Sequence, residues 1–461
     1  MPVYTRKKSG YPWDIQDIPL QQHKREVKVT EKWHKEPIEL FNETVITIPT
    51  FRKNNLDKMG HIPELKNMYL WIETTAQLEA YIKPLLDAAQ SRPINLAVDT
   101  EFIRENTYFS QLCLIQLAWE NHVALIDPIA LNGQLEPLRA VFTHKNILKI
   151  LHSGRQDLEI FWLVFKELPK PLYDTQIAAM VCGYGESIAY NLLVEHLLKI
   201  PLDKASRLTD WSKRPLNEEQ CKYAMADVTH LLHVYALLQA RIDETGRNLW
   251  IEEEIAELLN PALYEPTPEL AWQKIRANRL KPKSIEALKV MATYREQQAI
   301  ARDVPKSRLI KDEVLVDLAT HLPESMDQLK RMRGLPPSMR TNPFISHLLQ
   351  LIVQVKKSSE PSVQKDFIQD RILPHRYEGL LDLLRMLLKI VSEQEGVAPK
   401  LLANRNDLEQ LIIHTLEGVT PQFDHPLLEG WRFELFGNQA QKVILGQEGL
   451  YWNNGRISCR M

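Results

Sequence analysis

The sequence has few cysteines, no long apolar run and almost no net charge. Its 4 cysteines are scattered through 461 residues without a C-x-x-C pair, which excludes a disulfide scaffold and argues against a zinc or redox site. No run of 18 apolar residues occurs, so no membrane span is expected. The basic stretch Met1–Gly10 does not lead into an apolar stretch, so no secretory signal is predicted. We therefore expect a cytoplasmic protein with reduced thiols and no membrane partner.

The small net charge hides an uneven distribution. The formal net charge is -2, with 25% charged and 44% hydrophobic residues, which is an ordinary globular composition. Residues 96–240 hold 13 Lys and Arg against 17 Asp and Glu, a net of -4, whereas residues 268–355 hold 15 against 9, a net of +6. Acids gathered at a cleft can hold metal ions, and a basic module can hold phosphates. Charge alone, however, favours ordinary surface variation.

Proline positions and periodicity divide the chain into segments, as its length leads us to expect. Residues 1–67 are polar and irregular, and they are predicted as an extension of unknown role with one short strand at Glu43–Pro49. Residues 68–245 alternate strand-like and helical patterns. Residues 246–267, which contain Asn260-Pro261, are predicted as a linker. Two helical modules are predicted beyond it, at 268–357 and 360–461.

The segment 68–245 has the pattern of a layered α/β domain. Thr74 is a predicted helix N-cap, and the patterns from Asp174 to Gly246 are mainly helical. This order of elements predicts a mixed sheet covered by helices. The predicted strands are Ile94–Phe102, Cys113–Ala118, Val123–Asp127 and Ile147–Leu151, with helices at Leu135–Phe142 and Asp157–Phe165. In the first helical module, helices are predicted at Ser284–Ala301, Asp312–Leu322, Met326–Arg331 and Asn342–Val355.

Three polar clusters in the α/β segment carry possible chemistry. Asp99 and Glu101 project from one face at the end of a strand, because side chains alternate along a strand. Asp157 falls in the first turn of a helix, where a capping carboxylate is common. Tyr223 and Asp227 are four residues apart on one helix face. Taken singly, each cluster favours an ordinary structural role.

Taken together, the clusters predict a metal site. Four carboxylates at close quarters would repel one another unless cations neutralised them. All-oxygen ligands suit Mg²⁺ or Mn²⁺. Two such ions roughly 3.5–4 Å apart would clamp the attacking and leaving oxygens of a phosphodiester. We therefore hypothesise a site for two divalent cations, Mg²⁺ or Mn²⁺.

The order and spacing of these residues resemble the three exonuclease motifs of the DEDD superfamily, in its tyrosine subclass. The sequence segments around these residues are similar to those of ribonuclease D, and the resemblance covers roughly Met68 to Arg241. The helical remainder is similar to the paired HRDC domains that follow the nuclease in that family. The resemblance implies a ribonuclease H-like α/β exonuclease domain with a mixed sheet, followed by two all-α HRDC-type bundles. The resemblance rests on the segments Val98–Phe102, Gln111–Leu117, Ala124–Pro128, Leu151–Glu159, Leu172–Gln176, Asp210–Leu216 and Tyr223–Asp227, with Trp272–Ile275 and His425–Gly437 in the helical modules.

The resemblance also implies an activity and a role for each site residue. It implies a metal-dependent 3′-to-5′ exoribonuclease that trims structured RNA such as tRNA precursors and releases nucleoside 5′-monophosphates, without an obligate protein partner. By family role, Asp99, Glu101 and Asp227 would bind one metal ion, and Asp157 would hold the second, to which Asp99 would bridge. Tyr223 would orient the attacking water. Phe102 would stack on the terminal base, with core packing as an equal alternative.

Two other functions stay open on the sequence. A 3′-to-5′ DNA exonuclease of the same superfamily would use the same acids, because 2′-hydroxyl recognition is a detail of the pocket. The paired HRDC-like modules favour RNA. A non-catalytic RNA-binding protein that keeps the fold would be expected to lose an acid, whereas all four acids and Tyr223 are present. A monomer is expected.

Overall fold

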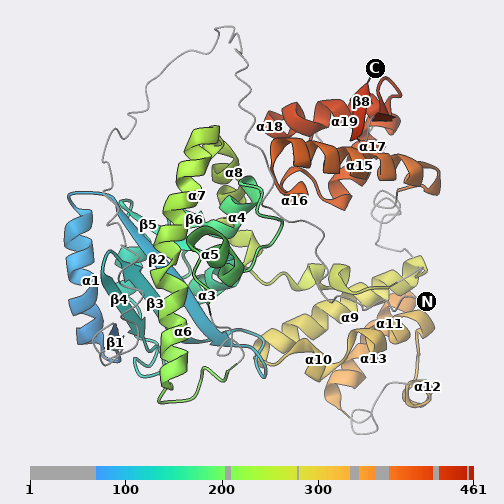
Figure 1. Cartoon of the computed structure of the whole chain (residues 1–461). Coiled ribbons are helices and arrows are strands. Elements are labelled where there is room, and N and C mark those ends of the chain that lie inside the picture. Colours follow the sequence, from blue (N-terminus) through green and yellow to red (C-terminus); the bar gives the residue numbers. More distant parts are fainter. Residues whose placement is uncertain are drawn as a thin grey trace, which may run out of the picture. The chain divides into compact units, whose positions relative to one another are not determined.

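The computed structural model describes residues 69–202, 209–277, 280–332, 342–358, 373–418, 425–453 and 456–460. The predicted extension 1–67, with its strand at Glu43–Pro49, lies outside these ranges. Within them, none of the helices combines the length and the apolar character that crossing a bilayer would need. Figure 1 shows a sheet flanked by helices and, after it in the chain, two groups of helices.

The nuclease-like segment contains a mixed sheet, as predicted, and this sheet has six strands. Its strand order is β1-β4-β3-β2-β5-β6. The β2–β3 and β3–β4 pairs are antiparallel, and the β1–β4, β2–β5 and β5–β6 pairs are parallel. The strands are β1 (Leu70–Ile72), β2 (Ile94–Ile103), β3 (Gln111–Trp119), β4 (His122–Ile126), β5 (Ile147–Leu151) and β6 (Leu172–Asp174). The outermost strands β1 and β6 were not predicted, because three residues are too few to show a period of two.

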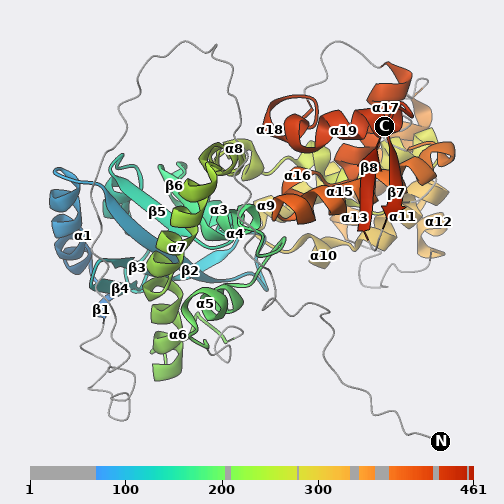
Figure 2. The same cartoon turned by 45° about the horizontal axis from the view of Figure 1, so that its top comes forward.

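Helices cover the sheet, and their positions follow from capping and apolar spacing. The Thr74 side chain accepts a hydrogen bond from the Gln77 N–H at 3.3 Å, so the predicted N-cap of α1 is confirmed. α6 contacts β2, β3 and β4, and α7 contacts β2 and β5, as Figure 1 and Figure 2 both show. The helices are α1 (Thr75–Ala89), α2 (Pro137–Phe142), α3 (Arg155–Phe165), α4 (Thr175–Val181), α5 (Tyr190–Leu198), α6 (Glu218–Thr229) and α7 (Leu231–Thr245).

The central strands are apolar on both faces because helices pack on both sides of the sheet. Leu96, Leu114, Ile115 and Leu117 are all fully buried. Each such side chain contributes about 1.5–3 kcal/mol by leaving water. This rigid centre holds the strand ends, where the polar residues of interest begin.

The range predicted as a linker, 246–267, carries packed structure of its own. It contains α8 (Asn248–Leu258), whose Ile251 and Ile255 are buried, and α8 contacts α4 and β6. A short 3₁₀ turn, Pro261–Leu263, follows at the predicted proline break. The segment between the sheet and the first helical module is therefore partly a helix of the nuclease-like core.

The first helical module is built around the long helix α9. Leu288, Met291, Leu315 and Leu348 lie in its core and are buried. The predicted helices are present within a few residues of their expected bounds. They are the 3₁₀ helix Pro268–Lys274, α9 (Pro282–Ala301), α10 (Lys306–Leu309), α11 (Asp312–His321), α12 (Met326–Lys330) and α13 (Pro343–Lys357).

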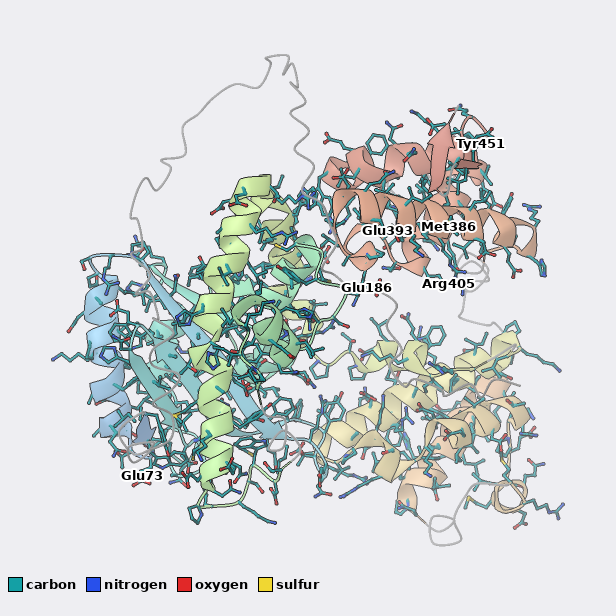
Figure 3. All side chains as sticks on the ribbon, viewed as in Figure 1. Glu73, Glu186, Met386, Glu393, Arg405 and Tyr451 are labelled. Atoms are coloured by element: carbon teal, nitrogen blue, oxygen red, sulfur yellow. The ribbon has the colours of Figure 1, made fainter. Side chains whose placement is uncertain are left out.

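The C-terminal module is helical but ends in a hairpin, which corrects the all-α prediction for this module. α15 buries Leu384 and Leu387, while its outer face, with Met386 and Glu393 (Figure 3), is exposed. β7 (Gly449–Asn453) and β8 (Arg456–Arg460) pair antiparallel. The helices are the 3₁₀ turn His375–Tyr377, α15 (Glu378–Glu395), α16 (Pro399–Leu402), α17 (Arg405–Glu417), α18 (Gly430–Arg432), the π-helical turn Phe433–Gly437 and α19 (Asn438–Ile444).

Candidate active site

The end of β2 supplies two of the predicted acids. Asp99 pairs with Gln116 of β3, and Glu101 pairs with Leu114, so both carboxylates lie on the same face of the sheet. A register shift between Glu101 and Phe102 ends the regular pairing just beyond them. Bulges commonly re-aim side chains beside functional sites.

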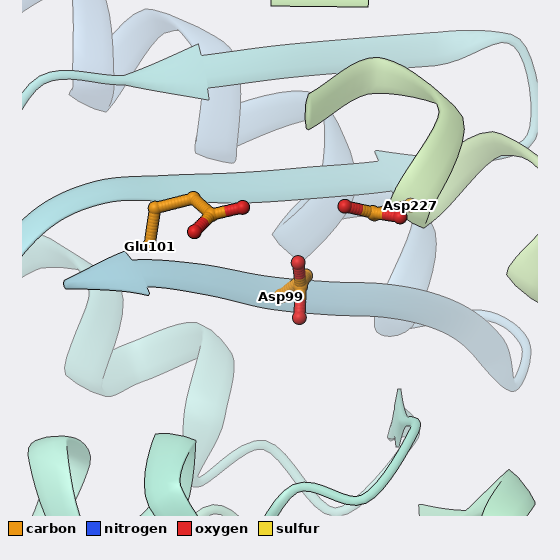
Figure 4. Close-up of side chains that lie close together, drawn as sticks. All are labelled: Asp99, Glu101 and Asp227. Atoms are coloured by element: carbon orange, nitrogen blue, oxygen red, sulfur yellow. The ribbon is translucent and has the colours of Figure 1, made fainter. Parts of the chain in front are cut away.

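Helix α6 brings the third acid to this face. Asn217 caps the helix by accepting the Gln220 N–H at 2.8 Å, which fixes where the helix starts. Asp227 then lies one turn beyond Tyr223. One carboxylate oxygen from each of Asp99, Glu101 and Asp227 lies within 4.8 Å of the others, and Figure 4 shows the three groups facing one another across β2 and α6.

The fourth acid, Asp157, lies outside this trio but acts on it electrostatically. It is buried in the first turn of α3, and the Thr100 hydroxyl donates a hydrogen bond to its Oδ1. Burial raises the pKa of Asp157 to about 6, although the Thr100 hydrogen bond opposes the rise. Thr100 lies between Asp99 and Glu101 on β2, so this strand carries two of the acids and the hydrogen-bond donor to Asp157.

The electrostatics at Asp99 suit a bound cation. Burial, followed by the negative charges of Asp227, Asp157 and Glu101, raises the pKa of Asp99 well above its ordinary value. A divalent cation would reverse this effect, because it favours the ionised carboxylates. The donor set is oxygen only, as Mg²⁺ or Mn²⁺ prefers. The arrangement therefore fits a divalent-metal site.

Asp174 fixes the turn that delivers Asp157. It is the N-cap of α4, and its carboxylate also accepts the N–H groups of Ser153 at 3.1 Å and Gly154 at 2.8 Å. A Cβ on Gly154 would lie 2.7 Å from the Leu151 side chain, so the turn from β5 into α3 requires glycine there. Asp174 lies within the family-like stretch Leu172–Gln176, but this role was not predicted from the sequence.

An ion pair fastens the segment that precedes α6. The Arg214 guanidinium donates to Asp127 Oδ2 at 2.6 Å and Oδ1 at 2.9 Å, and to the carbonyl of Cys113 at 2.5 Å. Asp127 follows β4 directly and is buried. This bidentate pair ties the segment before α6 to the sheet. Arg214 lies within the family-like stretch Asp210–Leu216, but this ion pair was not predicted from the sequence.

Tyr190 lies at the site and was not predicted. Its hydroxyl donates to the Ala226 carbonyl at 3.1 Å. Burial, followed by the charges of Asp227 and Asp99, raises its pKa. His152 packs beside it with ring centroids 5.4 Å apart, and both of its ring nitrogens are hydrogen-bonded, to Thr175 and to the Ile188 carbonyl. His152 is therefore a satisfied packing residue.

Two predicted residues lie at the margin of the acidic trio. Tyr223 is half-buried on α6, with its ring centroid 6.0 Å from that of the buried Trp211. Phe102 is half-buried just after Glu101 on β2. The structure thus brings Asp99, Glu101 and Asp227 together, places Asp157 near Asp99, and leaves Tyr223 one turn before Asp227 on α6 and Phe102 next to Glu101 on β2.

Comparisons with known proteins agree with this geometry. Residues 69–243 match the 3′-5′ exonuclease family, and residues 284–352 match the HRDC domain family. The chain is 36% identical over 411 residues to ribonuclease D of Bartonella henselae, and the aligned region covers 88% of this chain and 97% of that protein. It is 39% identical over 386 residues to ribonuclease D of Jannaschia sp., covering 82% and 96%. The crystal structure of Escherichia coli RNase D, described as an exoribonuclease involved in structured RNA processing, matches with a TM-score of 0.70 and 32% identity, covering 82% of this chain and 99% of that one.

Proposed function

The chain belongs to the ribonuclease D family and is a 3′-to-5′ exoribonuclease, and we propose that it trims the 3′ ends of structured RNA such as tRNA precursors with the help of two divalent cations. The observation that carries this proposal is the meeting of Asp99, Glu101 and Asp227 within 4.8 Å. Three buried free thiols, Cys113, Cys182 and Cys221, suit the reducing cytoplasm as its compartment.

Each site residue has a role in the proposed hydrolysis. Asp99, Glu101 and Asp227 would hold one cation, and Asp157 would hold the second, towards which Asp99 would also contribute an oxygen. Bound cations would supply Lewis-acid stabilisation of the attacking and leaving oxygens. The Tyr223 hydroxyl orients the attacking water by hydrogen bonding. Attack by water on the phosphorus between the last two nucleotides breaks its bond to the 3′ oxygen, which takes up a proton, so a nucleoside 5′-monophosphate is released and the shortened RNA ends in a 3′-hydroxyl.

The helical modules would supply affinity for the body of the RNA. Metal and phosphate contacts do not read the base sequence, so the choice of substrate must arise elsewhere. Residues 268–355 carry a net charge of +6, and this range contains the HRDC match at residues 284–352. An excess of positive charge of this size attracts the phosphates of a folded RNA. Phe102, next to the acids, would stack on the terminal base.

The proposal is tested with a 3′-extended tRNA and a DNA strand of equal length, each incubated with the full chain in Mg²⁺ and in EDTA. The expected result is Mg²⁺-dependent loss of single 5′-mononucleotides from the RNA extension. Equal action on both strands would favour general 3′-to-5′ exonuclease activity over RNA selectivity. Products with 3′-phosphates would contradict the proposed direction of attack.

Matched variants assign the activity to the site. Asp99→Asn removes a metal-binding charge at nearly constant volume, so turnover should fall at least about 100-fold. Asp87→Asn makes the same chemical change at an exposed position on α1, and it should leave turnover unchanged. Full activity of Asp99→Asn would remove Asp99 from the site.

A further inference from the structure

Gln116 is a buried amide on the same face of the sheet as the acidic trio. It lies on β3 directly opposite Asp99 of β2, and on its other side opposite Leu125 of β4. Directly paired residues of antiparallel strands point to the same face, with Cβ atoms about 4.5–5.5 Å apart. The Gln116 side chain therefore lies beside the Asp99 carboxylate.

Helix α6 covers Gln116 from above. Leu125 packs in one cluster with Cys221, Ala224 and Met225 of α6, and α6 contacts both β3 and β4. Asp227 lies on the same helix, one turn beyond Tyr223. The amide is thus enclosed between the strand that carries Asp99 and Glu101 and the helix that carries Asp227.

The amide is fully buried and has no protein partner. Gln116 has 0% exposed area, and neither its Nε2 nor its Oε1 has a hydrogen-bond partner among the residues that the structure describes. A buried, unpaired carboxamide is unfavourable, and such groups are rare in folded proteins. An apolar side chain of similar size, such as Met, would fill the same space without this disadvantage.

We propose that Gln116 is a positioning residue of the divalent-cation site, whose carboxamide hydrogen-bonds to the carboxylates and water molecules that surround a bound cation. A carboxamide suits this task because it offers two donors and an acceptor without adding charge. Its N–H groups can hold a carboxylate oxygen of Asp99 in place, and its carbonyl can accept from water. Outer partners of this kind typically change metal affinity by about 10–100-fold. This inference rests on the proposed cation site and names a residue that supports it.

The test uses the full chain, stripped with EDTA, and two measurements that do not depend on turnover. Mn²⁺ affinity is measured by the electron paramagnetic resonance signal of free Mn²⁺, and thermal stability is measured without cation. Gln116→Met should bind Mn²⁺ about 10–100-fold more weakly. In the absence of cation it should be as stable as the wild type or more stable, because a buried unpaired amide has been removed.

Leu114→Met provides the matched control. Leu114 lies two residues along the same strand face, opposite Glu101, and is also fully buried. A volume-conserving change there alters packing beneath α6 without removing a polar group, so Mn²⁺ affinity should stay within about twofold of the wild type.

Gln116→Glu is expected to change cation-free stability and the response to Mn²⁺ in the opposite directions from Gln116→Met. This second variant keeps the test decisive if Gln116→Met fails to fold. A further buried carboxylate beside Asp99 should lower the thermal stability of the cation-free protein and increase the stabilisation that Mn²⁺ produces. Unchanged Mn²⁺ affinity in Gln116→Met, or a Mn²⁺ response of Gln116→Glu equal to that of the wild type, would overturn the role of Gln116. Absence of Mn²⁺ binding by the wild type would instead refute the cation site itself.

Discussion

Asp157→Asn is expected to make the cation-free protein more stable, because burial disfavours the ionised form of the Asp157 carboxylate. Burial raises the pKa of Asp157 from 3.8 to about 6. Each pKa unit corresponds to about 1.36 kcal/mol, so the ionised group lowers the free energy of unfolding by about 3 kcal/mol above pH 6. Asparagine keeps the size of the side chain and an oxygen that can accept the Thr100 hydroxyl, but it carries no charge.

The pH dependence gives this prediction its sign. Between about pH 4 and pH 6 the folded protein retains the Asp157 proton while the unfolded chain has lost it. The folded state then binds more protons, so stability falls as pH rises through this window and stays lower above it. Asp157→Asn lacks this titration. The stability difference between the variant and the wild type should therefore be small at pH 4 and approach about 3 kcal/mol at pH 7.5.

Hydrogen exchange with mass spectrometry measures this difference locally, on peptides from β2, β3 and β5 in EDTA. Asp87→Asn on the exposed side of α1 is the control and should change protection by less than about 0.5 kcal/mol. Saturating Mn²⁺, at about 100 times its Kd, should stabilise the wild type by about 2.7 kcal/mol and Asp157→Asn by less. A variant that is less stable than the wild type at pH 7.5, or a difference that does not vary with pH, would refute the reasoning.

Four further substitutions have expected outcomes. Tyr223→Phe should lower kcat about 10- to 100-fold through loss of water orientation, with Mn²⁺ affinity by resonance unchanged; a large loss of affinity would contradict the orienting role. Burial lowers the pKa of Lys149 to about 7, although its ammonium donates to the carbonyls of Ile147 at 2.7 Å and His144 at 3.3 Å. Above pH 7 the unfolded chain therefore keeps a proton on Lys149 that the folded protein has lost, so the stability of the wild type rises with pH. Between pH 7.5 and 9.5 the free energy of unfolding of the wild type, measured by urea titration, should rise by about 2 kcal/mol relative to that of Lys149→Met. A difference between the two proteins that does not vary with pH would refute this. Lys281 is exposed, whereas the Lys283 ammonium donates to the Ser358 carbonyl at 2.6 Å at the end of α13. Lys281→Gln should reduce the slope of log affinity for tRNA against log salt by about 0.7–0.9 without altering stability, and Lys283→Gln should lower stability by about 1 kcal/mol; the reverse pattern would exclude Lys281 as a phosphate contact.

The elements that the sequence predicted best are those with long periodic or apolar patterns. The four predicted strands and the Thr74 cap are present, and each has a local signal in the sequence, namely an apolar run for the strands and a capping side chain for the helix. β1 and β6 depend on pairing with distant strands, and α8 lay hidden between proline-rich breaks that resemble a linker. The hairpin β7–β8 ends a stretch whose helical signal dominated. These misses share one cause, since tertiary contacts overrode weak local signals.

The candidate site was predictable as a set of residue types but not as a geometry. Alternation along β2 places Asp99 and Glu101 on one face, and helical spacing aligns Tyr223 with Asp227. Only the register of β2 with β3 shows that Gln116 stands beside Asp99. That register depends on a bulge, which sequence patterns do not locate.

Polar side chains on the strands of the nuclease segment fall into two kinds, and the difference separates structural groups from functional ones. Asp174 is buried, but its carboxylate accepts four backbone N–H groups, two of them in its own helix cap, and Lys149 is buried with its ammonium on three carbonyls. Each of these groups is satisfied by backbone atoms and fixes a turn. Asp99 is ionisable beside like charges, and Gln116 has no partner among the described residues. A fold selected for stability alone would replace these two with apolar residues, so their joint presence on one face argues that a cation and its surrounding ligands complete them.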